Sequence, residues 1–212
     1  MRDVQDDDQN VAPTKGFYGA ADVNVWYVDF AVNFTKDIAF RGMYAAEDWD
    51  VNNNVLPGGD DPKAWKAIVE VKQDALKFTS LWLEYSMWDA SFASANPFLN
   101  YADGPGTGFD NTGVMPMMMD PTRNSELTYL HAGLSQKWND QWTTFERYVA
   151  VDFDENNCAA YTDLSSYMIG VRYYYTPALF FVFLYDKVDY DEVAGTAWKD
   201  DNMFRFRTQV SF

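Results

Sequence analysis

The stretch that decides the fold is Met203 to Phe212, MFRFRTQVSF. Successive side chains of a β-strand point to opposite sides of the sheet. Read in this way, one side of the segment carries Phe204, Phe206, Thr208, Val210 and Phe212, and the other carries Arg205, Arg207, Gln209 and Ser211. The segment therefore predicts a strand with one face suited to hydrocarbon and the other suited to water.

The composition excludes spanning helices but leaves membrane strands open. Hydrophobic residues make up 48% of the 212 residues and aromatic residues 18%. The longest apolar run, Ala178 to Tyr185, is far shorter than the ~20 residues that a spanning helix needs. Strands can cross a bilayer with ~9–11 residues and give a weaker hydropathy signal.

The charge and the cysteine content exclude several function classes. With 32 acidic and 16 basic residues, the formal charge is -16, which argues against a nucleic-acid partner. The single Cys158 excludes an intramolecular disulfide framework and a cysteine-based zinc cluster. Met1 to Lys15 is acidic and lacks the apolar segment of a secretory signal, so we expect an exported protein to be a mature form or a piece of one.

The two-residue period recurs along the chain and predicts nine strands. It is clearest at Trp26, Val28, Phe30, Val32 and Phe34, which share one side. In two later segments we place the larger apolar side chains outward as well: Phe145, Val149, Val151, Phe153, and Phe180, Val182, Leu184, Val188, Tyr190. Arg147 and Asp186 do not fit that assignment.

The connections between these strands alternate in length. Short turns are predicted at residues 35–37, 73–75, 139–141 and 176–178, and long connections at 48–62, 90–123, 154–163 and 191–200. Short turns at one rim and long loops at the other are typical of outer-membrane barrels. Aromatic residues occur at both ends of the strands, as expected at the two membrane interfaces: Phe34, Trp138, Tyr175, Phe212, and Tyr44, Tyr85, Phe153, Tyr190.

These patterns predict an all-β fold, an antiparallel transmembrane β-barrel formed by residues 16–212, with residues 1–15 as a loop or terminal segment. Nine strands with Phe212 at the periplasmic rim would start the first strand at the opposite rim, whereas bacterial barrels have an even strand number. We therefore expect the C-terminal part of a larger barrel. The alternative is a small barrel of eight or ten strands.

Two segments carry a resemblance to a known family. The hairpin Val32 to Ala46, with the turn NFTKDIA at Asn33 to Ala39, and the closing strand Asn202 to Phe212 resemble the barrel of outer-membrane porins tethered to the cell wall by an S-layer homology domain. The resemblance implies a homotrimer of sixteen-stranded barrels in outer-membrane lipid. It also implies that an N-terminal part of the same barrel and a periplasmic wall-binding domain belong to the protein.

The predicted function is an outer-membrane diffusion channel for small hydrophilic solutes and ions. Its inward-facing, pore-lining residues are predicted to be Asp29, Arg41, Glu47, Lys66, Glu70, Lys72, Glu84, His131, Lys137, Glu146, Asp152, Arg172, Lys187, Asp189, Arg205 and Arg207. This wall is of mixed charge, and acidic loops would concentrate cations at the outer mouth, which predicts a weak cation preference. The long connection 90–123 would either constrict the pore or contact a neighbouring subunit.

An enzymatic function is not expected. His131 is the only histidine, and Ser135 lies too far along the same strand for a direct hydrogen bond. We expect neither a cofactor nor a bound metal. Two alternatives to the channel stay open: a structural or tethering outer-membrane barrel without an open pore, and a soluble β-sandwich binding module.

Overall fold

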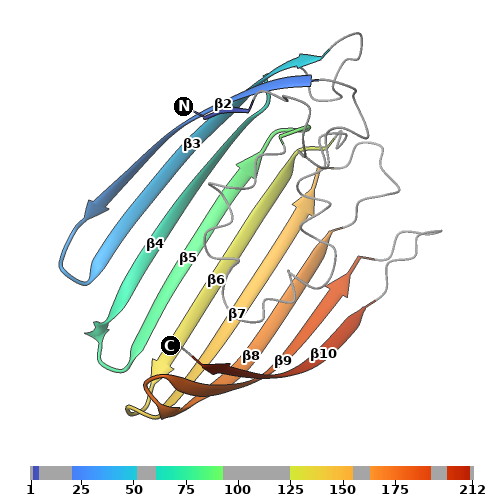
Figure 1. Cartoon of the computed structure of the whole chain (residues 1–212). Coiled ribbons are helices and arrows are strands. Elements are labelled where there is room, and N and C mark those ends of the chain that lie inside the picture. The colour runs from blue at the N-terminus through green and yellow to red at the C-terminus, as the bar shows by residue number, and fades with distance from the viewer. Residues whose placement is uncertain are drawn as a thin grey trace.

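The fold is a single curved antiparallel sheet, shown as a computed structural model in Figure 1. The structure describes residues 2–4, 21–51, 61–92, 125–154, 163–191 and 200–210, and all structural statements below refer to them. None of these residues is helical. The described part of the chain contains no helix long and apolar enough to cross a membrane.

Nine long strands follow one another in sequence order, and one short strand precedes them. Each strand pairs with the next, so the sheet has the order β1 to β10 and is open at both edges. The strands are β1 (Arg2–Val4), β2 (Ala21–Asn33), β3 (Ile38–Val51), β4 (Lys63–Leu76), β5 (Thr79–Trp88), β6 (Leu127–Lys137), β7 (Trp142–Phe153), β8 (Leu164–Thr176), β9 (Leu179–Tyr190) and β10 (Asp201–Val210).

The prediction of nine strands in an all-β fold is confirmed for β2 to β10. The first fifteen residues, expected to form a loop, contribute β1, which pairs with Val23 to Val25 of β2. The expected turn at 73–75 is wrong, because β4 continues to Leu76 and the chain turns at Lys77 and Phe78. Lys77 has a positive φ of 64°, the left-handed conformation that such a tight turn requires.

Side-chain acceptors fix the other short turns. Thr35 Oγ1 accepts hydrogen bonds from the backbone N–H groups of Asp37 and Ile38, at 3.1 and 3.0 Å. Asn139 Oδ1 does the same for Gln141 and Trp142, at 2.8 and 2.9 Å. These turns join β2 to β3 and β6 to β7, and the short hairpin turns gather at one end of the sheet (Figure 1).

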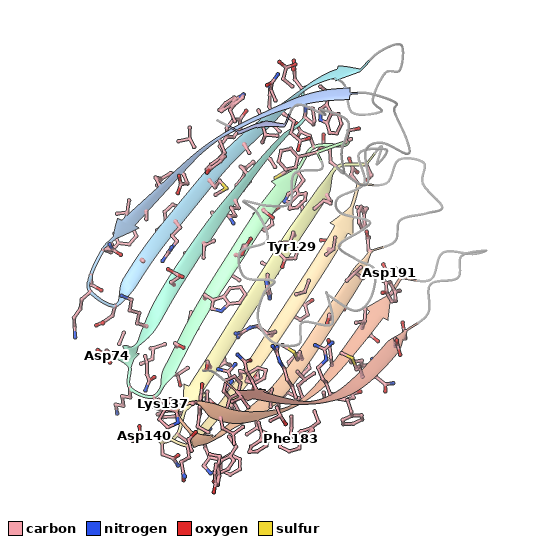
Figure 2. The ribbon with its side chains drawn as sticks, in the orientation of Figure 1. Asp74, Tyr129, Lys137, Asp140, Phe183 and Asp191 are labelled. Carbon is pink, nitrogen blue, oxygen red and sulfur yellow. The ribbon has the colours of Figure 1, made fainter. Side chains whose placement is uncertain are left out.

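The strand register divides the side chains into two faces, because directly opposed residues of an antiparallel pair point to the same side. We call the inner face the one that carries Lys66, which lies opposite Ser86, which in turn lies opposite Tyr129. We call the outer face the one that carries Trp65 and Phe183. Figure 2 shows Tyr129 over the hollow of the curved sheet and Phe183 at its outer margin.

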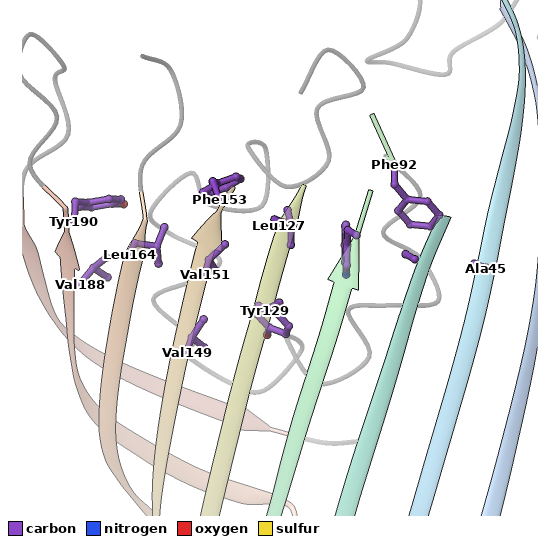
Figure 3. Packing of buried hydrophobic residues seen from close by; sticks show 12 residues of the cluster. Ala45, Phe92, Leu127, Tyr129, Val149, Val151, Phe153, Leu164, Val188 and Tyr190 are labelled. Carbon is purple, nitrogen blue, oxygen red and sulfur yellow. The ribbon is translucent and has the colours of Figure 1, made fainter. Parts of the chain in front are cut away.

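The buried core lies on the inner face, near the strand ends away from the short turns (Figure 3). Its members are Ala45, Ala64, Trp88, Phe92, Leu127, Tyr129, Val149, Val151, Phe153, Leu164, Val188 and Tyr190. Trp88 is fully buried, packs edge-on against Phe92 at 5.6 Å between ring centroids, and donates its indole N–H to Ser86 Oγ at 3.1 Å. The inner face therefore changes along the strands from an apolar core to the charged region described next.

Candidate functional site

Eleven of the sixteen residues expected to line a pore lie on the inner face, as the register shows. They are Asp29, Arg41, Glu47, Lys66, Glu70, Glu84, His131, Lys137, Arg172, Arg205 and Arg207. Lys137 ends β6 opposite Thr143 on the same face and forms an ion pair with Asp140 at 3.0 Å. Lys72 is exposed just after Val71, where the pairing of β4 with β5 becomes irregular.

Four of the expected residues lie on the outer face instead. Glu146 and Asp152 of β7 stand opposite the outward Leu134 and Thr128, and Lys187 and Asp189 of β9 stand opposite Tyr167 and Ser165. The orientation predicted for these two strands is therefore wrong. The apolar residues that we expected to point outward, such as Val151 and Val182, are buried on the inner face.

Arg147 and Asp186, which did not fit the expected orientation, explain the error. Both lie on the inner face, together with Phe145 and Leu184 of the same strands. The prediction gave more weight to the size of apolar side chains than to these two charges. In each strand, this charged residue was the signal in the sequence that the large apolar side chains on its side point to the inner face.

On β2 to β6 the inner face carries both acidic and basic groups. Arg41 Nε donates to Glu70 Oε2 at 2.8 Å in an exposed ion pair. Lys66 and Glu84 are both buried, and their opposite charges attract each other. A hollow of about 320 Å³ lies beside Arg41 and Lys66. It is bounded by Asp29, Phe30, Ala31, Arg41, Gly42, Met43, Lys66 and Ile68.

His131 lies within this region and is fully buried. Its Nδ1 is 2.7 Å from the hydroxyl of Tyr129, and its ring meets Trp82 edge-on at 4.3 Å between centroids. The residue directly opposite is Glu84. Among the described residues, His131 Nε2 and Glu84 Oε1 have no hydrogen-bond partner.

On β5 to β7, an arginine and an indole meet over a glycine. A side chain at Gly133 would place its Cβ 2.5 Å from the ring of Trp82 and 2.6 Å from Nη1 of Arg147. The guanidinium of Arg147 lies 5.2 Å from the centre of the indole and donates to the carbonyl groups of Leu134 and Glu146, at 3.3 and 3.0 Å. Glycine at 133 is what allows this close approach.

The same arrangement recurs on β7 and β8. The ring of Phe145 occupies the space above Gly170, where a Cβ would lie 2.3 Å from the ring. The guanidinium of Arg172 lies beside it, within 5.2 to 5.9 Å of the rings of Phe145, Tyr174 and Phe180. Arg172 Nη1 donates to the hydroxyl of Tyr174 at 3.1 Å. Aromatic faces attract a cation at such distances, so the rings hold this guanidinium in place.

The outer face exposes many large apolar side chains, and its aromatic rings contact one another across strands. Toward the long-connection end, Trp26 meets Tyr44 and Trp65 meets Tyr85, each at 5.5 Å between centroids. Toward the short turns, Phe78 meets Trp138 at 5.1 Å and Trp142 meets Tyr173 at 4.6 Å. On β10, Phe204 is 82% exposed and Phe206 is 58% exposed.

Two of the aromatic residues expected at the strand ends are placed differently. Phe153 and Tyr190 are buried on the inner face, where they belong to the core. Phe34, Trp138 and Tyr175 are exposed, as the expectation requires. Phe212 lies outside the described residues.

Comparison with known proteins adds no assignment to this geometry. No protein-family model matches the chain, and no curated protein is significantly similar to it. The described residues also hold no cluster of three or more His, Cys, Asp or Glu side chains that could bind a metal ion.

Proposed function

We propose that the chain forms part of the wall of an outer-membrane diffusion channel, a porin that passes small hydrophilic solutes and ions. The observation that carries this proposal is the contrast between the two faces of one sheet. The outer face exposes large apolar side chains such as Phe204, Phe206 and Phe183, whereas the inner face holds charged groups such as Lys66, Glu84 and Arg172. The outer face carries charge as well, at Glu146, Asp152, Lys187 and Asp189. A single soluble layer has no reason to expose such an apolar face to water, whereas hydrocarbon favours it.

The paired rings on the outer face support the same proposal. Amphipathic Trp and Tyr side chains gather where a spanning protein meets the two membrane interfaces. Trp26 and Trp65 lie toward one end of the strands, and Trp138 and Trp142 lie at the other end. On this proposal the strands between them cross the hydrocarbon layer of the outer membrane.

The two open edges of the sheet support a larger barrel. β10 pairs only with β9 among the described residues, which leaves one row of its backbone groups without strand partners in this part of the chain. In lipid such an edge must be closed by further strands. We propose that an N-terminal part of the same polypeptide closes it, giving about sixteen strands and an aqueous lumen. The complete barrels would then assemble as homotrimers.

The corrected faces change the charge of the proposed wall. Glu146, Asp152, Lys187 and Asp189 are no longer assigned to the lumen. Arg147 and Asp186 are assigned to it instead. The inner face itself is then not acidic. A weak cation preference would have to come from the acidic connections at the mouth, because the chain as a whole has a formal charge of -16.

Planar-bilayer recording tests the channel. The purified protein, inserted into the bilayer from detergent, is expected to give discrete conductance steps. In a KCl gradient it is expected to give a small reversal potential, with the sign that indicates a preference for cations over anions. Detergent-solubilised protein should also run with the mass of a trimer, and peptide mapping should recover sequence beyond the 212 residues. Insertion without any conductance step would refute the open channel.

The buried cluster on the inner face favours one other function. Trp88, Leu127, Phe153 and Tyr190 form a core where an open lumen would be wet. A barrel filled in this way would be a structural or tethering element of the membrane without an open pore. The same bilayer recordings distinguish the two functions, because a filled barrel would insert without producing conductance steps.

A further inference from the structure

The four arginines on the inner face of β7 to β10 differ from the cations on β2 to β4. Arg41 is paired with Glu70, and Lys66 lies near Glu84. In contrast, none of Arg147, Arg172, Arg205 and Arg207 forms an ion pair within the residues that the structure describes. Positive charge is therefore left uncompensated on one side of the inner face, although the chain carries twice as many acidic as basic residues.

The register places these arginines around one apolar patch. Gly170 lies opposite Phe145 on one side and Leu184 on the other, and Leu184 lies opposite Arg205. Arg172 follows Gly170 on the same face of β8, and Arg207 lies across Val182 from Arg172. Arg147 and Arg172 are close enough for their positive charges to repel each other. An anion between them would relieve this repulsion.

Arg172 has the most ring contacts of the four arginines among the described residues. The rings of Phe145, Tyr174 and Phe180 surround its guanidinium, and the Tyr174 hydroxyl accepts one of its hydrogen bonds. Its Nε is buried and has no hydrogen-bond partner among the described residues. A guanidinium held in a fixed plane loses little side-chain freedom when it binds, and it suits the paired oxygens of a carboxylate or phosphate.

One carboxylate lies near the group and does not neutralise it. Asp186 Oδ1 accepts a hydrogen bond from Ser166 at 2.8 Å, and the charge of Asp186 attracts Arg205. No ion pair joins Asp186 to any arginine in the described part of the chain. One acidic and four basic side chains leave an excess of positive charge at this place.

We propose that the surface formed by Arg172, Arg147 and Arg205 around Phe145 and Gly170 is an anion subsite, which takes the carboxylate or phosphate group of a small solute. The oxygens would bind the guanidinium groups, and the partly exposed rings of Tyr174 and Phe180 beside Arg172 would contact an apolar part of the solute. The proposal rests on the proposed function in one respect, since the inner face must be open to solutes.

Direct binding tests the subsite without requiring conductance. Detergent-solubilised protein is titrated in a calorimeter with sodium benzoate and, separately, with inorganic phosphate. Wild-type protein is expected to bind at least one of them, and Arg172→Gln is expected to weaken binding by about tenfold or more, as loss of a charge-assisted hydrogen bond implies. Benzoate alone would identify a carboxylate site with an apolar contact, and phosphate alone a site for phosphoryl groups.

Two further variants keep the test decisive. Arg205→Gln, on the more exposed β10, should weaken binding by a smaller factor and guards against a folding defect in Arg172→Gln. Lys187→Gln removes a positive charge from the outer face of β9 and should leave binding unchanged. Absence of binding of both anions to folded wild-type protein would overturn the subsite, as would equal binding by wild type and Arg172→Gln. Conductance steps in the same preparation would still support the channel. Failure of the anion subsite is therefore distinguishable from failure of the proposed channel function.

Discussion

The outer and inner faces of the sheet are both rich in large apolar side chains, but these side chains meet different surroundings. On β9, Phe183 is half exposed on the outer face, whereas its neighbours Val182 and Leu184 are buried on the inner face. On β2 the contrast is simple, with Trp26, Val28 and Phe30 on one side and Asp29 on the other. Apolar content alone therefore does not distinguish a core from a lipid-facing surface. On β2 a charged residue distinguishes the two faces, whereas β9 carries Asp186 on the inner face and Lys187 and Asp189 on the outer face.

The largest difference between the faces should appear when a tryptophan is removed from each. Trp88→Ala empties a fully buried inner position and should lower the free energy of unfolding by about 3–5 kcal/mol. Trp26→Ala on the outer face removes a half-exposed ring with one ring contact, to Tyr44, and should cost less. Urea unfolding followed by tryptophan fluorescence measures both. Equal losses would show that the inner cluster is not a packed core.

A charge placed on each face tests what surrounds it. Leu83→Arg puts a cation among exposed apolar residues of the outer face and should destabilise the protein in lipid vesicles by about 2–4 kcal/mol, if the position lies near the bilayer midplane. Asp29→Arg puts the same side chain at an exposed inner position and should change stability by less than about 0.5 kcal/mol. A Leu83→Arg variant as stable as wild type in vesicles would place the outer face in water.

On β6, the crowded glycine lies on the inner face. Gly133→Val would drive a side chain into Trp82 and Arg147 and should cost about 1–3 kcal/mol. The adjacent outer position offers a matched change, Ala132→Val, where the added methyl groups face outward and should cost little. The denaturant concentrations at the unfolding midpoints of the two variants are compared, provided that their unfolding slopes are equal. If Gly133→Val unfolds at the same concentration as wild type, the indole of Trp82 and the guanidinium of Arg147 move aside freely.

The sequence was sufficient for the strands and for most of the faces. Alternation predicts β2, β6, β8 and β10 correctly, because on each of these strands polar or small residues separate the two sides. The same principle failed on β7 and β9. There, charged residues occur on both sides of the strand: Glu146 and Asp152 against Arg147 on β7, and Lys187 and Asp189 against Asp186 on β9. Alternation therefore gave no unambiguous orientation for these two strands.

The arrangement around Arg172 could not be predicted from one sequence. Phe145 and Gly170 are 25 positions apart, and their contact depends on the register of β7 against β8. A register shift of one residue would put every side chain of a strand on the other face. Alternation fixes which residues share a side of one strand, but it does not fix which residues of the neighbouring strand they meet.

The smallest effect is expected at the exposed ion pair of the inner face, where charge should matter for ions more than for folding. Arg41 and Glu70 are 55% and 21% exposed, so Glu70→Gln should lower the free energy of unfolding by less than about 1 kcal/mol. The buried Glu84→Gln is the matched change and should cost more, because the charge of Lys66 would lose its nearby counterion. In bilayers, Glu70→Gln should shift the reversal potential toward anions, since it removes a negative charge from the inner face beside Arg41. If Glu70→Gln clearly lowers stability without shifting the reversal potential, the Arg41–Glu70 ion pair stabilises the sheet and does not face the lumen.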